Sequence, residues 1–144
     1  MSAACDTNVL LYASDEQSPR QRAAVELLTR LAQGPEIVYL FWPVLIGYLR
    51  IATHPSVFER PLTPARAMAN VDGLLGRPHI RAPGEQPGFW DTFTQLTGGD
   101  VVRGNLVSDA HLAALMRQQG VSTIWTADRD FRRFSGIAVR NPFS

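Results

Sequence analysis

The sequence contains no lysine, a single cysteine and no long hydrophobic run, and each absence excludes something. Cys5 has no second thiol in the chain to pair with, so an internal disulfide is excluded, as expected of a protein in the reducing cytoplasm. The longest apolar stretch, residues 37–47, is interrupted by Pro43 and is too short to span a bilayer. No basic and apolar leader precedes Asp6, so we expect neither secretion nor membrane insertion.

Because lysine is absent, all 14 cationic residues are arginine. The net charge of +1 gives no sign of a nucleic-acid partner. The planar guanidinium does suit bidentate contacts to phosphate, although GC-rich codon usage would give the same bias towards arginine. Basic residues gather near the C-terminus, and the local charges there are Arg129, Arg132, Arg133 and Arg140 against Asp128 and Asp130.

Length and composition indicate one soluble domain spanning residues 1–144, with 45% hydrophobic and 19% charged residues. Buried-strand patterns and helical patterns alternate along the chain, which is typical of a parallel α/β sheet. We expect strands at 3–5, 37–41, 79–82, 122–125 and 137–139. We expect helices at 7–13, 20–33, 43–53, 64–75, 89–96 and 105–119. Thr7 or Asn8 is the expected cap of the first helix.

Three aspartates stand out because each falls at a junction between a strand and a helix: Asp6, Asp109 and Asp128. The carboxyl ends of parallel strands meet at one edge of a sheet, where ligands bind in open α/β folds. Gathered carboxylates repel one another unless a cation neutralises them, and Mg²⁺ or Mn²⁺ with oxygen ligands does so. Such an ion assists phosphodiester hydrolysis. Any one of these aspartates is readily explained as a helix or turn cap, but the three together favour a metal site, with Asp130 as a further ligand.

Three motifs resemble those of the PIN-domain nucleases and, more narrowly, of the VapC toxins from bacterial toxin–antitoxin pairs. They are Asp6-Thr7-Asn8-Val9-Leu10-Leu11, residues 105–113 (NLVSDAHLA) and Thr126-Ala127-Asp128-Arg129-Asp130-Phe131. The resemblance covers nearly the whole chain in order and spacing. It implies an αβα sandwich around a central parallel sheet of four to five strands. It also implies a homodimeric Mg²⁺- or Mn²⁺-dependent endoribonuclease that cleaves RNA and is silenced by a cognate antitoxin.

One position departs from the family pattern. Members usually carry a glutamate in the helix after the second strand, just before a hydrophobic-Leu-Arg sequence, and Gly47 occupies that place here, before Tyr48-Leu49-Arg50. The loss removes one carboxylate from the expected metal site. It leaves open a second reading, in which the chain is a PIN-like module that binds RNA or its antitoxin without cutting. A third reading is a sheet-edge phosphohydrolase acting on a small phosphate ester.

Other polar residues near the motifs have a functional and a structural reading. Asn8, Asn105 and Ser108 would orient the carboxylates or cap helices, and Thr126 would position an attacking water or end a strand. The residues that would contact RNA phosphate are Arg50 and Arg129. His111 reads as a structural side chain, because no second histidine or cysteine lies at zinc spacing.

The expected homodimer is assigned to the apolar surface of the helix at 43–53. Bulky residues crowd this part of the chain, and one domain of this size is not expected to bury them all. Leu45, Tyr48 and Leu49 are therefore the expected dimer contacts.

Overall fold

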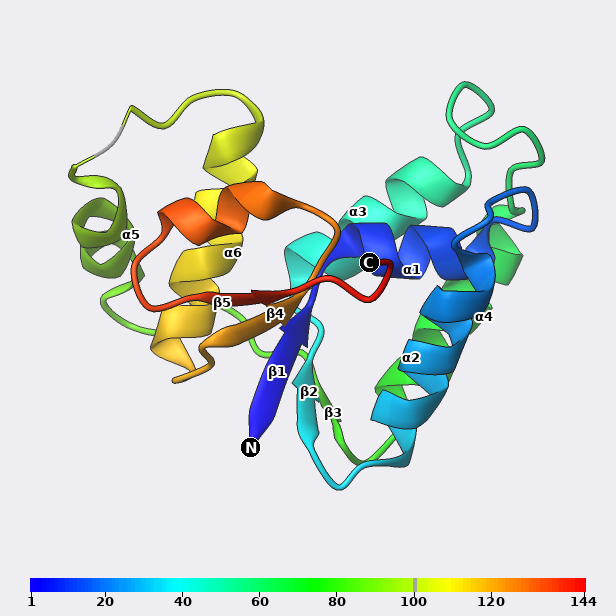
Figure 1. Ribbon diagram of the computed structural model, residues 1–144, viewed down its shortest axis with the longest axis horizontal. Helices are drawn as coiled ribbons and strands as arrows, with labels where there is room; N and C mark the ends of the chain where they lie inside the picture. The colour runs from blue at the N-terminus through cyan, green and yellow to red at the C-terminus, as the bar shows by residue number, and fades with distance from the viewer. Residues whose placement is uncertain (100) are drawn as a thin grey trace.

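Five parallel strands form one sheet with the order β3-β2-β1-β4-β5 in the computed structural model, which describes residues 1–99 and 101–144 (Figure 1). The strands are β1 (Ser2–Cys5), β2 (Ile37–Tyr39), β3 (Ile80–Arg81), β4 (Thr123–Trp125) and β5 (Ala138–Arg140). Central strand β1 pairs with β2 on one side and β4 on the other, which places Ala4 opposite both Tyr39 and Ile124. The predicted parallel α/β sheet is confirmed, at the upper end of the expected strand number.

Helices connect the strands in the predicted order. They are α1 (Thr7–Ser14), α2 (Gln21–Gln33), α3 (Trp42–Ala52), α4 (Pro64–Leu75), α5 (Phe89–Thr97), α6 (Asn105–Gln118) and the short 3₁₀ helix η1 (Arg129–Arg133). The bounds of α1 to α6 agree with the expected ranges to within about two residues, the usual uncertainty of a helix end, whereas η1 was not expected. The sequence Gly98-Gly99-Asp100 predicts a flexible turn before α6, and residue 100 of that turn lies outside the described residues. None of the described helices combines the length and hydropathy needed to cross a bilayer.

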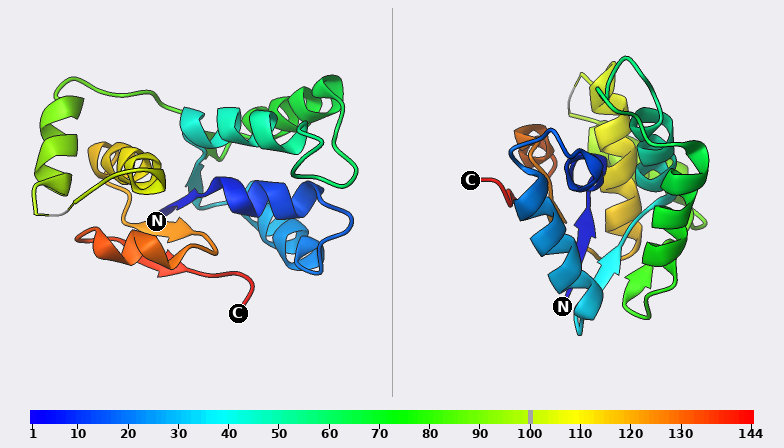
Figure 2. Two further views of the ribbon diagram at one scale, coloured as in Figure 1. Left: turned by 90° about the horizontal axis from the view of Figure 1, so that it is seen from above. Right: turned by 90° about the vertical axis from the view of Figure 1, so that its right-hand side faces the viewer.

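Figure 1 shows how the helices are distributed around the sheet. Helices α5 and α6 lie at one end, beside β4 and β5, and α1 to α4 lie at the other end. Figure 2 shows the same division from above, with α2 and α4 on opposite sides of the molecule. All strands point the same way, so their carboxyl ends share one edge, from which α1, α3 and η1 begin.

The centre of the sheet is closed to solvent on both faces. Ala3, Ala4 and Cys5 of β1 are 0% exposed, as expected of a strand that has neighbours on both sides and is covered on both faces. Burial raises the pKa of the Cys5 thiol above its usual range, so Cys5 behaves as a small apolar residue here. Phe41 and Phe131, also fully buried, extend the core towards the carboxyl edge of the sheet.

The structure corrects the expected dimer surface on α3. Leu45 and Tyr48 are 0% and 2% exposed, because α3 packs against both α1 and α4 and buries them in the monomer. The Tyr48 hydroxyl shares a 2.6 Å hydrogen bond with the Ser14 hydroxyl and accepts one of 2.9 Å from the Asn70 amide. Dimer contacts therefore cannot use Leu45 or Tyr48, and Leu49 is only partly buried beside them.

Candidate functional site

The acidic residues singled out in the sequence lie around the carboxyl edge of the sheet. Asp6 directly follows β1, and Asp128 lies between β4 and η1. Asp130 belongs to the first turn of η1, and Asp109 lies in the second turn of α6. Three separate segments of the chain therefore bring these four carboxylates to this edge, as expected where parallel strands end together.

Asp6 is held by its neighbours in a fixed orientation. Its backbone is extended, and its Oδ1 accepts a 2.7 Å hydrogen bond from the backbone N–H of Thr7, so Asp6 itself caps α1. The expectation that Thr7 or Asn8 caps this helix is wrong, because both already lie within the first turn. The Oδ2 of Asp6 accepts hydrogen bonds from the Thr126 hydroxyl at 2.8 Å and the Asn8 amide at 3.3 Å.

Thr126 is the hub that joins the ends of β1 and β4. It is 0% exposed, and besides donating to Asp6 its hydroxyl accepts hydrogen bonds from Asn8 Nδ2 at 3.0 Å and from the backbone N–H of Asp128 at 2.9 Å. A hydroxyl has one proton to donate and two lone pairs, and all three are used. Thr126 therefore orients two of the aspartates and has no capacity left to position an attacking water.

Asn8 completes this connection from the side of α1. Its Oδ1 accepts a 3.2 Å hydrogen bond from the backbone N–H of Ala127, while its amide nitrogen donates to Asp6 and Thr126. The sequence left two roles open for Asn8, capping a helix and orienting the carboxylates. Its contacts in the structure support the second role.

Three carboxylates form a compact cluster beside Asp6. One oxygen atom each from Asp109, Asp128 and Asp130 lies within 4.8 Å of the others. Oδ1 of Asp128 also accepts a 2.8 Å hydrogen bond from the backbone N–H of Asp130, which fixes the two relative to each other. Asp6 lies outside this set of three, although its charge helps to raise the pKa of Asp109. The sequence had placed Asp130 as an auxiliary ligand, whereas the structure places it inside the cluster.

The cluster cannot easily hold all of its negative charge. Burial, followed by repulsion from Asp128, Asp6 and Asp130, raises the pKa of Asp109 to about 7, and a hydrogen bond shared with Asp128 adds to the shift. Burial also raises the pKa of Asp6, and the Asp128 charge adds to this, while hydrogen bonds from Thr126 and Thr7 oppose it. A divalent cation would relieve both conflicts.

The donor set fits such a cation. Its members are carboxylate oxygens only, which suit hard ions such as Mg²⁺ or Mn²⁺ better than zinc, whose sites in proteins are rich in histidine and cysteine. Their mutual distances are short enough for a single ion to contact all three. Asp109, Asp128 and Asp130 are therefore the residues that would hold a metal.

Gly47 lies beside this site, on α3. A Cβ built at Gly47 would meet the side chain of Thr7 at 3.5 and 3.7 Å, which is ordinary van der Waals contact. The backbone N–H of Thr7 donates to the carboxylate of Asp6, so the position where the family pattern has a glutamate is one residue removed from the acidic site. No close packing explains the glycine, and a side chain has room there.

The remaining predicted residues lie at the margins of the site. Asn105 and Ser108 are exposed in the first turn of α6, and among the described residues neither side chain hydrogen-bonds to a carboxylate. Gly104, with a φ of 61°, occupies the N-cap position, so neither residue caps α6. Arg129 is exposed next to Asp128, and Arg50 is exposed in the last turn of α3.

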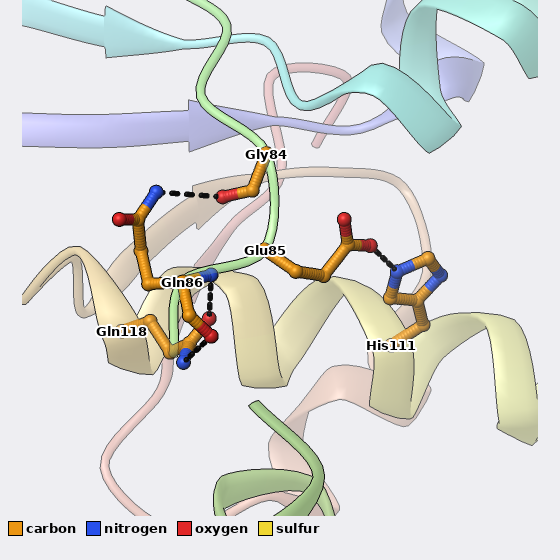
Figure 3. Close-up of polar contacts among 5 residues, drawn as sticks. All are labelled: Gly84, Glu85, Gln86, His111 and Gln118. Carbon is orange, nitrogen blue, oxygen red and sulfur yellow. Dashed lines mark hydrogen bonds and ion pairs between the residues drawn. The ribbon is translucent and has the colours of Figure 1, made fainter. Parts of the chain in front are cut away.

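His111 and its neighbours tie a loop to the helix that carries Asp109 (Figure 3). His111 Nε2 lies 2.7 Å from Glu85 Oε1, which lowers the pKa of Glu85, and the His111 ring packs edge-on against Phe89 at 5.5 Å. Gln86 and Gln118 exchange hydrogen bonds of 2.9 and 3.0 Å. The prediction that His111 is structural agrees with these contacts. The loop contacts were missed, because nothing in the sequence pairs Glu85 or Gln86 with a distant helix.

Comparison with known proteins places the chain in a family. A family model described as "PIN domain" matches residues 3–137. Ribonuclease VapC48 of Mycobacterium tuberculosis is 48% identical over 144 residues, which is 100% of this chain and 99% of that protein. Ribonuclease VapC43 of the same organism is 37% identical over 139 residues, covering 95% of this chain and 92% of that protein.

Solved structures agree on the fold. Mycobacterium tuberculosis VapC20, described as a Sarcin-Ricin loop cleaving toxin, superposes with a TM-score of 0.66 at 19% identity, over 94% of this chain and 98% of that chain. A chain of the FitAB complex bound to a DNA fragment superposes with a TM-score of 0.68 at 21% identity, over 99% of this chain and 96% of that chain. At identities of 19% and 21%, the structural likeness supports the fold alone. The family assignment rests on the relatives that are 48% and 37% identical in sequence. The chain therefore belongs to the PIN-domain family and, within it, to the VapC ribonucleases.

Proposed function

We propose that this protein is a metal-dependent endoribonuclease and acts as the toxin of a type II toxin–antitoxin pair. The observation that carries the proposal is the cluster of Asp109, Asp128 and Asp130 at the carboxyl edge of a VapC framework. Residues 1–144 would act as one PIN domain in the cytoplasm. RNA is the proposed substrate because the sequence relatives are ribonucleases.

Each residue of the site has a distinct task in this proposal. Asp109, Asp128 and Asp130 would hold Mg²⁺ or Mn²⁺, and such an ion would supply Lewis acidity to water and to the scissile phosphate. The pKa of Asp109 is raised to about 7, and a cation at this position would favour the ionised carboxylate. Asp6 adds negative charge at the edge of the cluster, and Thr126 and Asn8 hold it in place. Arg129 is exposed next to Asp128, where it can contact a substrate phosphate, and Arg50 would do so from α3.

An antitoxin is the proposed protein partner. Structural neighbours include VapBC of Salmonella typhimurium, a complex bound to DNA. A groove of about 570 Å³ lies between α2 and α4, with Leu28 and Leu74 among its lining residues. Its polar lining residues include Ser14 and Tyr48, and its charged ones are Arg66, Arg77 and Glu16. An amphipathic antitoxin segment with acidic flanks would suit this mixture of apolar and basic groups.

A homodimer remains part of the proposal, with a revised surface. Trp42 and Ile46 are 44% and 56% exposed and lie four residues apart on one face of α3. Exposed apolar residues at that spacing form a stripe on a helix, which a second copy of the chain would cover.

The second candidate function is a PIN-like module that binds RNA or its antitoxin without cutting. Gly47 is the observation that favours it, because it removes a carboxylate next to the site. Incubation of the purified protein with labelled RNA, in Mg²⁺, in Mn²⁺ and in chelator, separates the two. Metal-dependent cleavage that disappears in Asp109→Asn supports the nuclease. Binding of RNA without cleavage, in Mg²⁺ and in Mn²⁺, would support the non-cleaving PIN-like module instead.

A further inference from the structure

Three arginines on one side of the molecule are stacked on aromatic rings. The Arg20 guanidinium lies 5.1 Å from the centroid of Tyr12 and 5.2 Å from that of Phe143. Those of Arg30 and Arg140 lie 5.8 and 5.5 Å from the centroid of Trp125. We call Arg20, Arg30 and Arg140 the arginine face. Both views in Figure 2 place α2, β5 and the C-terminal tail, which carry these residues, on the side opposite α4.

The charges of the arginine face are not neutralised within the protein. Among residues 1–99 and 101–144, Arg22 is the one arginine whose guanidinium lies within 4.0 Å of a carboxylate, at 3.6 Å from Glu26. All three members of the arginine face are exposed. Stacking on a ring limits where each guanidinium can point. Nη1 of Arg20 donates a 3.1 Å hydrogen bond to the Tyr12 hydroxyl, which leaves its other N–H groups for an anionic ligand.

Hydrogen bonding within the protein does not explain why residue 125 is tryptophan. Its Nε1 is buried and lacks a hydrogen-bond partner among the described residues, which costs about 1–3 kcal/mol. Phenylalanine would fill similar space without a buried N–H. The indole is, however, the strongest aromatic partner for a guanidinium, and here it serves two.

The arginine face is joined directly to the acidic site. Trp125 and Arg140 are the last residues of β4 and β5, paired across the sheet, and Trp125 precedes Thr126. The backbone N–H of Thr126 donates a 3.0 Å hydrogen bond to the carbonyl of Arg140, and that of Asp6 donates one of 3.0 Å to the carbonyl of Trp125. The strand ends that carry Trp125 and Arg140 are therefore joined through the backbone to the residues that carry the acidic site.

We propose that the arginine face binds the phosphates of single-stranded RNA next to the acidic site, with Trp125 and Tyr12 as its supports. The inference rests on the proposed ribonuclease function, because it assigns this surface to the same substrate. The acidic cluster repels a phosphate backbone, so a substrate-binding surface has to supply positive charge nearby. Uncompensated guanidinium groups held on rings are suited to that task.

Binding is measured by fluorescence anisotropy with a labelled single-stranded RNA of about 12 nucleotides, on an Asp109→Asn background that prevents cleavage. Arg30→Gln and Arg140→Gln should each weaken binding about fivefold at about 0.1 M salt, and each should lower the slope of log K against log[salt] by about 0.7. Arg22→Gln, on the same helix but paired with Glu26, is the matched control and should change neither quantity.

The role of the indole is tested separately from its packing. Trp125→Phe keeps a smaller and weaker ring beneath both guanidinium groups, so it should weaken RNA binding, but by less than Trp125→Leu. Trp125→Leu should weaken binding to the level of the arginine variants, provided that thermal melts show it folded. A folded Trp125→Leu with parental affinity would remove Trp125 from the proposal.

The outcomes also separate this inference from the proposed function. If the unmodified protein cleaves RNA but Arg30→Gln and Arg140→Gln bind no worse than Arg22→Gln, the arginine face alone is wrong. If Arg30→Gln and Arg140→Gln bind RNA poorly but the unmodified protein cleaves no RNA in either metal, the nuclease assignment is wrong and the RNA-binding role of the arginine face is supported. A glutamate-rich peptide is the remaining probe. If its affinity drops in Arg30→Gln while RNA affinity does not, the face belongs to a protein partner and the inference is overturned.

Discussion

The hydroxyl of Thr126 donates a 2.8 Å hydrogen bond to Oδ2 of Asp6, across 120 residues of sequence. The same oxygen atom of Thr126 accepts from Asn8 and from the backbone of Asp128. One buried hydroxyl thus sets the relative positions of two aspartates, and this relationship leads to the first prediction.

Thr126→Val should destabilise the protein and weaken metal binding together. Valine has nearly the same shape but leaves Asp6 without its shortest side-chain donor and leaves the Asp128 N–H unpaired, at a cost of about 1–3 kcal/mol in the free energy of unfolding. Urea unfolding measures the stability, and calorimetry of Mn²⁺ binding measures the affinity. Thr126→Ser, which keeps the hydroxyl, is the control and should stay close to the parent. If Thr126→Val had the same free energy of unfolding as the parent, the Thr126 hydroxyl would not be what holds Asp6 and Asp128 in place.

Asp109 should make the metal-free protein less stable as pH rises. The folded-state pKa of Asp109 is raised to about 7 from a usual value of 3.8, so between these values the folded state binds more protons than the unfolded state. The free energy of unfolding therefore falls with rising pH across this window. Asp109→Asn should remove that part of the slope, which thermal melts in chelator from pH 4 to pH 8 will measure. In the parent, Mn²⁺ should restore stability at pH 8.

Gly47→Glu should tighten Mn²⁺ binding. A Cβ at this position meets only Thr7, at ordinary contact distance, and the longer side chain would bring a carboxylate to the region next to Asp6. Gly47→Gln has the same shape without the charge and should leave Mn²⁺ affinity unchanged. Gly47→Ala should stabilise the protein by up to about 1 kcal/mol, because glycine disfavours a helix interior. Calorimetry that gives equal affinities for the glutamate and glutamine variants would remove Gly47 from any metal role.

Ile46→Glu should convert the proposed homodimer into monomers, as measured by light scattering at micromolar concentration. Ile46 is 56% exposed on α3, and a charge in the middle of an apolar contact would be desolvated without a partner. Val25→Glu, at a residue 43% exposed on α2, is the matched control and should leave the dimer intact. A parent protein that is already monomeric would refute the dimer.

The predictable part of this structure is the part that local pattern determines. The burial of Val38 and Ile124 within short β-branched runs, and the stop at Gly34 after α2, follow from periodicity and turn chemistry. The gathering of the aspartates at one edge follows from parallel topology, once the strands are known.

The rest depends on contacts between distant segments. The cap of α1 was misassigned because capping depends on backbone dihedrals, and the extended residue is Asp6. Tyr48 and Leu45 were assigned to a dimer because an apolar helix does not reveal how many neighbours it has; α3 has two. The saturation of the Thr126 hydroxyl cannot be read from its own segment, since its partners come from both ends of the chain.

The position of β1 in the sheet has a consequence for synthesis. β1 is made first, yet Asp6 at its end acquires its orienting partner only when Thr126 pairs beside it, and the metal-binding carboxylates follow at Asp128 and Asp130. A ribosome making this chain therefore carries no assembled site until β4 and the residues directly after it have left the exit tunnel. The pairing of β4 with β1, rather than the synthesis of β1 itself, is the event that creates the acidic site.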